Sequence, residues 1–98
     1  MDLTAILVQY GFVTHKHPGI EYRFGKAIRR RRRELDLSQE ELAEKSGLHR
    51  NYISSIENGE RNPSLKNIAK LAAALDLSVA ALFANYDIEV KSELKTNS

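Results

Sequence analysis

The chain has 98 residues, enough for one small domain, and its 42% hydrophobic and 29% charged residues are typical of a folded protein rather than a disordered one. It contains no cysteine, which excludes disulfides and thiol chemistry, and its formal net charge is only +2. The basic residues are nevertheless concentrated, because arginine occupies every position from 29 to 33. The distribution of charge is therefore more informative than its total.

The first residues predict a short amphipathic helix ahead of the main domain. Four apolar side chains share one helical face: Leu3, Ile6, Leu7 and Tyr10. Polar residues interrupt this segment and no basic region precedes it, so we expect neither a signal peptide nor a membrane span. Pro18 and Gly19 then indicate a turn. We accordingly treat residues 1–21 as an N-terminal extension.

A second periodic pattern predicts a helix over residues 22–36, which contains the whole arginine run. Its buried stripe is formed by Phe24, Ala27, Ile28 and Leu35, with Arg31 at the edge. Its outward face is expected to carry Lys26, Arg29, Arg30 and Arg33. Like charges four residues apart destabilise an isolated helix by roughly 0.2–0.5 kcal/mol per pair. A nearby polyanion or acidic partner would relieve that repulsion, and the alternative is a simply solvated face.

Residues 38–59 predict two short helices joined by a tight turn. Ser38 and Glu41 form a capping box that starts a helix at Gln39, and Gly47 ends that helix. The stretch "RNYISSIENG" predicts the second helix, in which Ile53 and Ile56 face inward. Gly59 is expected to end this helix. The spacing indicates a helix-turn-helix, in which the first helix crosses DNA phosphates and the second lies in the major groove.

Two more helices are predicted beyond the "ERNPS" loop. Strong periodicity predicts one from Leu65 to about Leu75, and Ser78 caps a last short one. The apolar residues of the last helix exceed what one small core needs, so we predict a dimer interface made of Val79, Leu82 and Phe83. The domain then spans residues 22–86. Residues 87–98 form a polar tail, in which Ile88 and Val90 are compatible with a short strand or with packing on the domain.

The exposed face of the second helix-turn-helix helix carries side chains suited to reading bases: Arg50, Asn51, Ser54 and Ser55. Arginine bonds guanine in a bidentate manner, asparagine does the same with adenine, and serine bonds either base. An ordinary polar surface is the alternative. For Tyr52, packing against the neighbouring helix and a phosphate contact are equally compatible with the sequence.

The stretch "LSQEELAEKSGLHRNYISSIENGERNPSL" resembles the Cro/C1-type helix-turn-helix family, also called the XRE family, and the similarity extends from about Phe24 to Phe83. Within this family the chain is most similar to the small controller proteins of restriction-modification systems, which are autoregulating dimers. The resemblance implies an all-α, five-helix, lambda-repressor-like helix-turn-helix domain.

The same resemblance implies roles for individual positions. The residues matching those that contact the DNA backbone are Gln39, Tyr52, Arg61, Asn62, Lys66 and Asn67. Arg32 and Glu57 match an internal ion pair that joins the first helix of the family core to the third. Asp36 stands where the family often has a glycine in the left-handed conformation, and Arg31 stands where it usually has an apolar residue.

We therefore predict a sequence-specific transcriptional regulator that binds operator half-sites in double-stranded DNA as a cytoplasmic homodimer, with RNA polymerase or another protein as a further partner. The alternative is an antitoxin-type regulator or protein-interaction module that uses the same fold to bind a protein. No enzyme is predicted, because the sequence has neither a glycine-rich phosphate loop nor a nucleophile with a positioned base. No cofactor or metal is expected. His15 and His17 lie in a connector and His49 is distant from them in the sequence, so we interpret all three as solvated side chains rather than metal ligands.

Overall fold

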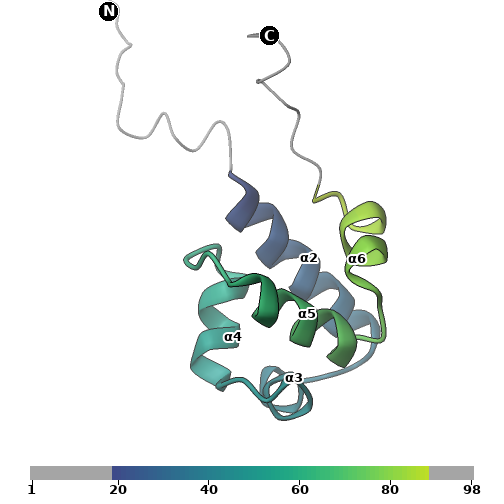
Figure 1. The fold of residues 1–98 in the computed structure, drawn as a ribbon. Helices are drawn as coiled ribbons and strands as arrows, with labels where there is room; N and C mark the ends of the chain where they lie inside the picture. Colours follow the sequence, from purple (N-terminus) through teal and green to yellow (C-terminus); the bar gives the residue numbers. More distant parts are fainter. Residues whose placement is uncertain (1–18, 89–98) are drawn as a thin grey trace, which may run out of the picture.

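The computed structural model describes residues 19–88, which form five helices (Figure 1). In chain order these helices are α2 (Ile20–Glu34), α3 (Gln39–Ser46), α4 (Arg50–Glu57), α5 (Leu65–Ala74) and α6 (Val79–Asn85). The all-α, five-helix prediction is confirmed, with helix ends within a few residues of those expected. The helix predicted around Leu3 and residue Val90 lie outside the described residues. For Ile88, where the sequence left a short strand and packing on the domain open, packing is confirmed, since its side chain is 3% exposed and belongs to the core.

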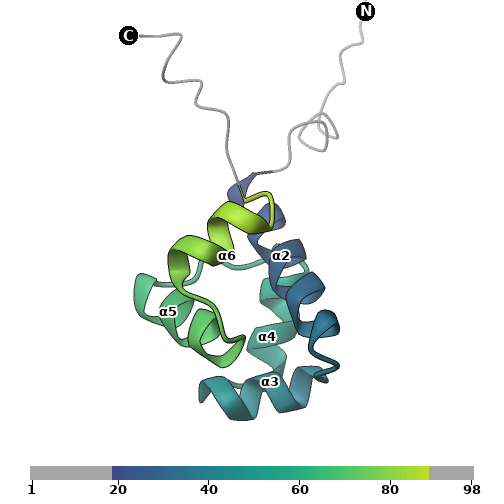
Figure 2. The same ribbon diagram turned by 90° about the vertical axis from the view of Figure 1, so that its right-hand side faces the viewer.

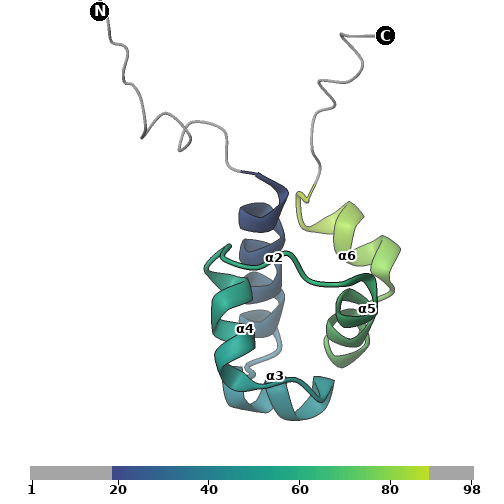
Figure 3. The same ribbon diagram turned by 60° about the vertical axis from the view of Figure 1, so that its left-hand side comes forward.

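The helices enclose one core. Helices α2 and α4 run side by side, α3 closes one end of the bundle, and α5 and α6 form the opposite side (Figures 1 and 3). Figure 2 shows α6 beside both α5 and α2, where the rings of Phe24 and Phe83 lie 5.9 Å apart. The large side chains with less than 2% exposure are Ile28, Leu42, Ile53, Ile56, Leu71, Leu75 and Leu82. Burial of each such side chain stabilises the fold by about 1.5–3 kcal/mol.

The predicted helix signals are present as hydrogen bonds. Ser38 Oγ accepts a bond from the Glu41 amide at 2.9 Å, and Glu41 Oε1 accepts one from the Ser38 amide at 2.8 Å, which completes the capping box. Gly47 follows α3 with a φ of 74°, in the left-handed region that glycine adopts without strain. Within residues 19–88, no single helix is long and apolar enough to cross a membrane.

The tetrapeptide Leu-Asp-Leu-Ser occurs twice and makes the same turn each time, after α2 and after α5. Asp36 and Asp76 have φ values of 58° and 60°. In both turns the following leucine amide bonds a carbonyl five residues back, Leu37 to Arg32 at 3.0 Å and Leu77 to Ala72 at 2.9 Å. Asp36 therefore adopts the left-handed conformation for which the family often uses glycine, and the helix end keeps its usual geometry.

Gly25 lets α2 and α4 approach to backbone contact. A Cβ atom at this position would overlap the Ile56 carbonyl oxygen and lie 2.9 Å from that of Glu57. Only a residue without a side chain fits between the two helices at this crossing. The contact holds the last turn of α4 against α2, which brings Glu57 within reach of the arginine run.

Candidate nucleic-acid interface

One face of α4 is buried and the opposite face is presented outward. Ile53 and Ile56 have exposures of 0% and 1%, as their inward placement predicts. The four side chains predicted to contact bases lie on the other faces, with Arg50 and Asn51 exposed and Ser54 and Ser55 half-buried. The structure therefore brings all four to one helix surface, as a base-reading role requires.

Hydrogen bonds within α4 limit what this surface can offer a ligand. Arg50 Nη1 donates to Asn51 Oδ1 at 3.3 Å, so the two side chains lie next to each other. Ser55 Oγ donates to the Asn51 carbonyl at 3.0 Å. Because that bond uses the hydroxyl hydrogen, Ser55 is left to accept hydrogen bonds rather than donate them.

Tyr52 organises the residues predicted to contact the DNA backbone. Asn67 Nδ2 donates to its hydroxyl at 3.1 Å, and the Arg61 guanidinium lies 5.4 Å from its ring centre. The half-buried ring thus joins the recognition-helix candidate to the loop after it and to the start of α5. Packing, one of the two roles considered for Tyr52, is confirmed. Asn62 and Lys66 are exposed beside this cluster.

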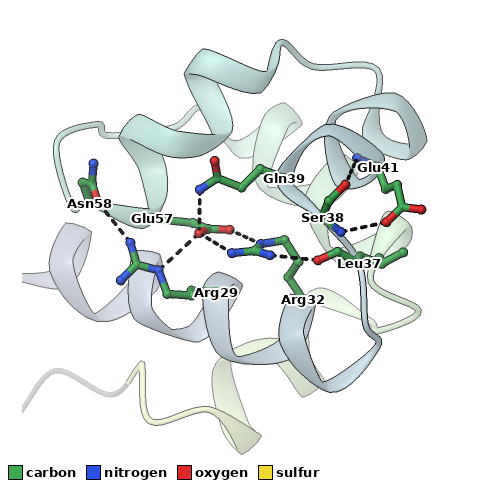
Figure 4. Close-up of polar contacts among 8 residues, drawn as sticks. All are labelled: Arg29, Arg32, Leu37, Ser38, Gln39, Glu41, Glu57 and Asn58. Carbon is green, nitrogen blue, oxygen red and sulfur yellow. Dashed lines mark hydrogen bonds and ion pairs between the residues drawn. The ribbon is translucent and has the colours of Figure 1, made fainter.

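Glu57, at the end of α4, is the centre of a buried polar network (Figure 4). Its carboxylate accepts bonds from Arg32 Nε at 2.7 Å and Arg32 Nη2 at 3.0 Å, so the predicted ion pair is confirmed and is bidentate. Arg32 also donates to the Leu37 carbonyl at 2.8 Å. The side chain of Glu57 has no exposed surface, so these bonds replace the water that a free carboxylate would bind.

Two further residues complete the network. Gln39 Nε2 donates to Glu57 Oε1 at 3.0 Å, which places this side chain against α4; its predicted phosphate contact remains a prediction. Arg29 Nε donates to Glu57 Oε1 at 3.3 Å, and Arg29 Nη2 donates to Asn58 Oδ1 at 3.0 Å. The expectation that Arg29 simply faces outward is wrong in part, because the close crossing at Gly25 puts Glu57 and Asn58 beside it (Figure 4), while its side chain keeps 35% exposure.

We call Glu57 with Arg29, Arg32 and Gln39 the Glu57 network. Burial raises the pKa of the Glu57 carboxyl, and the hydrogen bonds and charge of Arg32, the bond from Gln39 and the bond from Arg29 lower it. The lowering prevails, so the pKa lies below its ordinary value and the group is ionised at neutral pH. A charged Glu57 joins α2, α3 and α4, and so sets the position of α4.

A second cluster forms on the other side of α2, and we call it the Glu34 cluster. Tyr86 donates to Glu34 Oε1 at 2.6 Å, and Arg30 and Arg31 lie 3.5 and 3.6 Å from the two oxygens of that carboxylate. Arg31 Nε also donates to the Leu75 carbonyl at 2.9 Å, at the end of α5. This bond explains how a basic side chain occupies a position that is usually apolar in the family.

The α6 surface corrects one part of the dimer prediction. Leu82 has 0% exposure because it packs within the core of its own chain, so it has no surface left for a partner. Val79 and Phe83 are half-buried, and Ala80 and Ala84 are exposed beside them. The apolar surface of α6 is therefore smaller than predicted and centred on Phe83.

A tight helix-turn-helix pair, an outward polar face on its second helix and a rim of basic and amide side chains define the class of helix-turn-helix DNA-binding proteins. The chain belongs to the helix-turn-helix family HTH_3, whose match covers residues 28–82.

Three of the proteins to which the chain is similar are control or controller proteins. Control protein C.MunI of Mycoplasma sp is 45% identical over 71 residues, which are 71% of this chain and 96% of that protein. The crystal structure of the restriction-modification controller C.AhdI from Aeromonas hydrophila has a TM-score of 0.63 and 49% identity, over 64% of this chain and 96% of that one. The restriction-modification controller C.Esp1396I has been crystallised as a tetramer with its natural 35-base-pair operator. Its structure has a TM-score of 0.66 and 32% identity, over 69% of this chain and 90% of that one.

Proposed function

We propose that the protein is a sequence-specific DNA-binding transcriptional regulator that binds operator half-sites as a homodimer and acts as the autoregulating controller of a restriction-modification system. The observation that carries this proposal is the outward face of α4, flanked by the Tyr52 cluster and supported from behind by the buried Glu57 network. The similarity to restriction-modification controllers supports it over a module that binds only protein.

The residues of the interface divide into two roles. Arg50, Asn51, Ser54 and Ser55 contact base edges in the major groove, with Ser55 accepting from an exocyclic amino group. The residues that hold phosphates and fix the register of α4 are Gln39, Tyr52, Arg61, Asn62, Lys66 and Asn67. Tyr52 acts mainly by holding Arg61 and Asn67 in place.

A homodimer supplies the second recognition helix that useful specificity requires, since one helix covers only a few base pairs. The proposed dimer surface is the outer face of α6. It combines half-buried Val79 and Phe83 with a hollow of about 470 Å³ whose lining includes Ala80, Ala84 and Ile88. Small alanine side chains on this face let two copies approach closely. The regulator works in the cytoplasm, without a catalytic step, and RNA polymerase is a further partner.

The test is selection of bound DNA from a random pool with the purified protein, followed by binding measurements on the selected duplex. Arg50→Ala is expected to cost about 1–3 kcal/mol on that duplex and to relax base preference at one position per half-site. Arg61→Ala is expected to weaken binding to all sequences and to lower the salt slope by roughly one. Lys70→Ala, an exposed change on α5, serves as the control. If no sequence is enriched and neither arginine variant alters DNA retention, the proposal fails.

A further inference from the structure

The outer side of α2 carries four exposed basic residues that the Glu57 network does not use. They are Arg23, Lys26, Arg30 and Arg33, and we call them the α2 basic face. Their spacing of three and four residues places them on one side of the helix, over a length of about 15 Å. Phe24 and Ile28 point from the opposite side into the core, with exposures of 4% and 0%.

The positive charge of this face is poorly balanced by the protein itself. Within residues 19–88 the only ion pair of the α2 basic face joins Arg30 to Glu34, at 3.5 Å. Lys26 lies four residues before Arg30, and Arg30 lies three before Arg33, so like charges adjoin along the helix. Each such pair disfavours the helix by roughly 0.2–0.5 kcal/mol. A bound anion would turn this repulsion into attraction.

The face is also hollowed. Two hollows, of about 320 and 460 Å³, adjoin along α2 and share Lys26 and Arg30 in their linings. Tyr22 and Tyr86 line the first. Lys26 Nζ lies 5.5 Å from the ring centre of Tyr22, and the Arg30 guanidinium lies 5.3 Å from that of Tyr86. The rings thus position two of the cations along a shallow track formed by the adjoining hollows, whose linings are mainly basic and also include one carboxylate each, Asp87 and Glu34.

The chemistry of this track favours a phosphate backbone over a protein partner. The central part of a protein interface is depleted in charge and contains apolar anchors. Here the central residues are charged, and each of the two tyrosine rings has a cation beside it. A nucleic-acid interface is polar and strongly basic, and basic grooves with tyrosines are typical of surfaces that follow a nucleic-acid strand.

We propose that the α2 basic face is a second nucleic-acid contact, separate from the α4 interface, that binds a phosphodiester backbone without reading bases. The backbone belongs either to duplex DNA flanking the half-site or to a separate single strand. The contact uses different residues from those that read bases, so it stands even if the proposed operator specificity does not.

The test compares two double variants that lose the same charge. K26Q/R33Q removes two side chains of the α2 basic face that form no ion pair within residues 19–88. K45Q/K70Q removes two exposed lysines from α3 and α5. Binding to a mixed-sequence duplex of about four helical turns (~40 bp) and to oligo(dT) of about 30 nucleotides is measured by fluorescence anisotropy over a range of salt concentrations.

We expect K26Q/R33Q to lower the slope of log affinity against log salt by about 1.8 on the duplex or about 1.4 on the single strand. K45Q/K70Q should change neither slope by more than a few tenths. The probe that responds identifies the source of the backbone, and circular dichroism verifies that both variants fold. In the Arg50→Ala background the effect should persist, which separates this contact from base reading.

Two results would overturn the proposal. Equal changes in the two double variants would mean that only net charge matters. If poly-L-glutamate bound the native protein and not K26Q/R33Q, while the slopes for both nucleic-acid probes stayed unchanged, the face would be a site for an acidic protein.

Discussion

The Glu57 network and the Glu34 cluster are built from the same run of arginines but in opposite surroundings. Each gathers two arginines of α2 around one carboxylate, and each adds a third, uncharged donor, Gln39 in one and Tyr86 in the other. The Glu57 side chain is 0% exposed, whereas that of Glu34 is 43% exposed. The two regions therefore test what burial does to the same chemistry.

The arginine–carboxylate distances are shorter in the buried Glu57 network than in the exposed Glu34 cluster, as expected where water cannot complete the hydrogen bonds of the carboxylate. In the Glu57 network a single arginine bonds both carboxylate oxygens, at 2.7 and 3.0 Å. In the Glu34 cluster the two arginines approach only to 3.5 and 3.6 Å, and water is free to complete the shell. A buried carboxylate that loses a partner has no solvent to replace it, so the energetic consequences of the two should differ widely.

The largest expected effect is that of Arg32→Ala. It leaves the Glu57 carboxylate buried without its bidentate partner, at a cost of about 3–5 kcal/mol. This is a large part of the roughly 5–15 kcal/mol that stabilises a small domain. Urea denaturation followed by circular dichroism measures the loss. Arg33→Ala, at the next position and exposed, is the control. Similar losses of unfolding free energy for both variants would show that the buried Arg32–Glu57 ion pair does not stabilise the fold more than an exposed arginine does.

Gly25→Ala tests how the Glu57 network is assembled. The added methyl group would overlap the Ile56 carbonyl oxygen, so α2 and α4 must separate at a cost of about 1–3 kcal/mol. Ala27→Gly, in the same helix, provides a comparison in which a buried methyl group is removed instead. Thermal unfolding measures both, and a stabilised Gly25→Ala protein would show that the crossing is not a backbone contact.

Acid should act on the Glu57 network in a defined direction. Because its pKa is lower in the folded protein than the ordinary 4.5, the unfolded chain binds a proton first, and stability falls as pH drops from about 4.5 through the lowered value. Glu57→Gln should be less stable than the native protein at pH 7 and should lose less further stability on acidification. Denaturation midpoints at a series of pH values measure this, and parallel curves for the two proteins would contradict it.

The sequence was sufficient to predict the elements and the residues of the α4 face because the signals involved are local. A capping box, two glycine stops and apolar periodicity depend on neighbours within one or two turns. The Arg32–Glu57 pair could be predicted only through the resemblance to the family. No local pattern links residues separated by 25 positions.

The contacts that could not be predicted from the sequence depend on how the helices pack against one another. Gly25 carried no turn signal, yet it sets the distance between α2 and α4 and thereby brings Glu57 within hydrogen-bonding distance of Arg29, whose side chain stays 35% exposed. Leu82 shares helical periodicity with Phe83 and Val79, and only the packing shows that its surface is already used by the core. Residues that face outward on a helical projection are assigned correctly only when the partner helices are placed.

The smallest effect is expected in the Glu34 cluster. Tyr86→Phe removes the 2.6 Å hydrogen bond to Glu34 and keeps the ring that lies over Arg30. That bond is the main cause of the lowered pKa of Glu34, and burial opposes it while Arg30 and Arg31 add to it. The pKa of Glu34 should therefore move up toward its ordinary value in the variant, while the thermal midpoint stays within the error of measurement.

A titration of the Glu34 carboxyl followed by NMR separates the two quantities. An exposed carboxylate that loses a protein donor takes up water in its place, so a shift in pKa without a loss of stability is the result that surface exposure predicts. Glu34→Gln provides the assignment of the resonance. A midpoint lowered as much as in Arg32→Ala would mean that Tyr86 and Glu34 hold the end of α6 on α2 as firmly as Glu57 holds α4, and the contrast between the two regions would no longer stand.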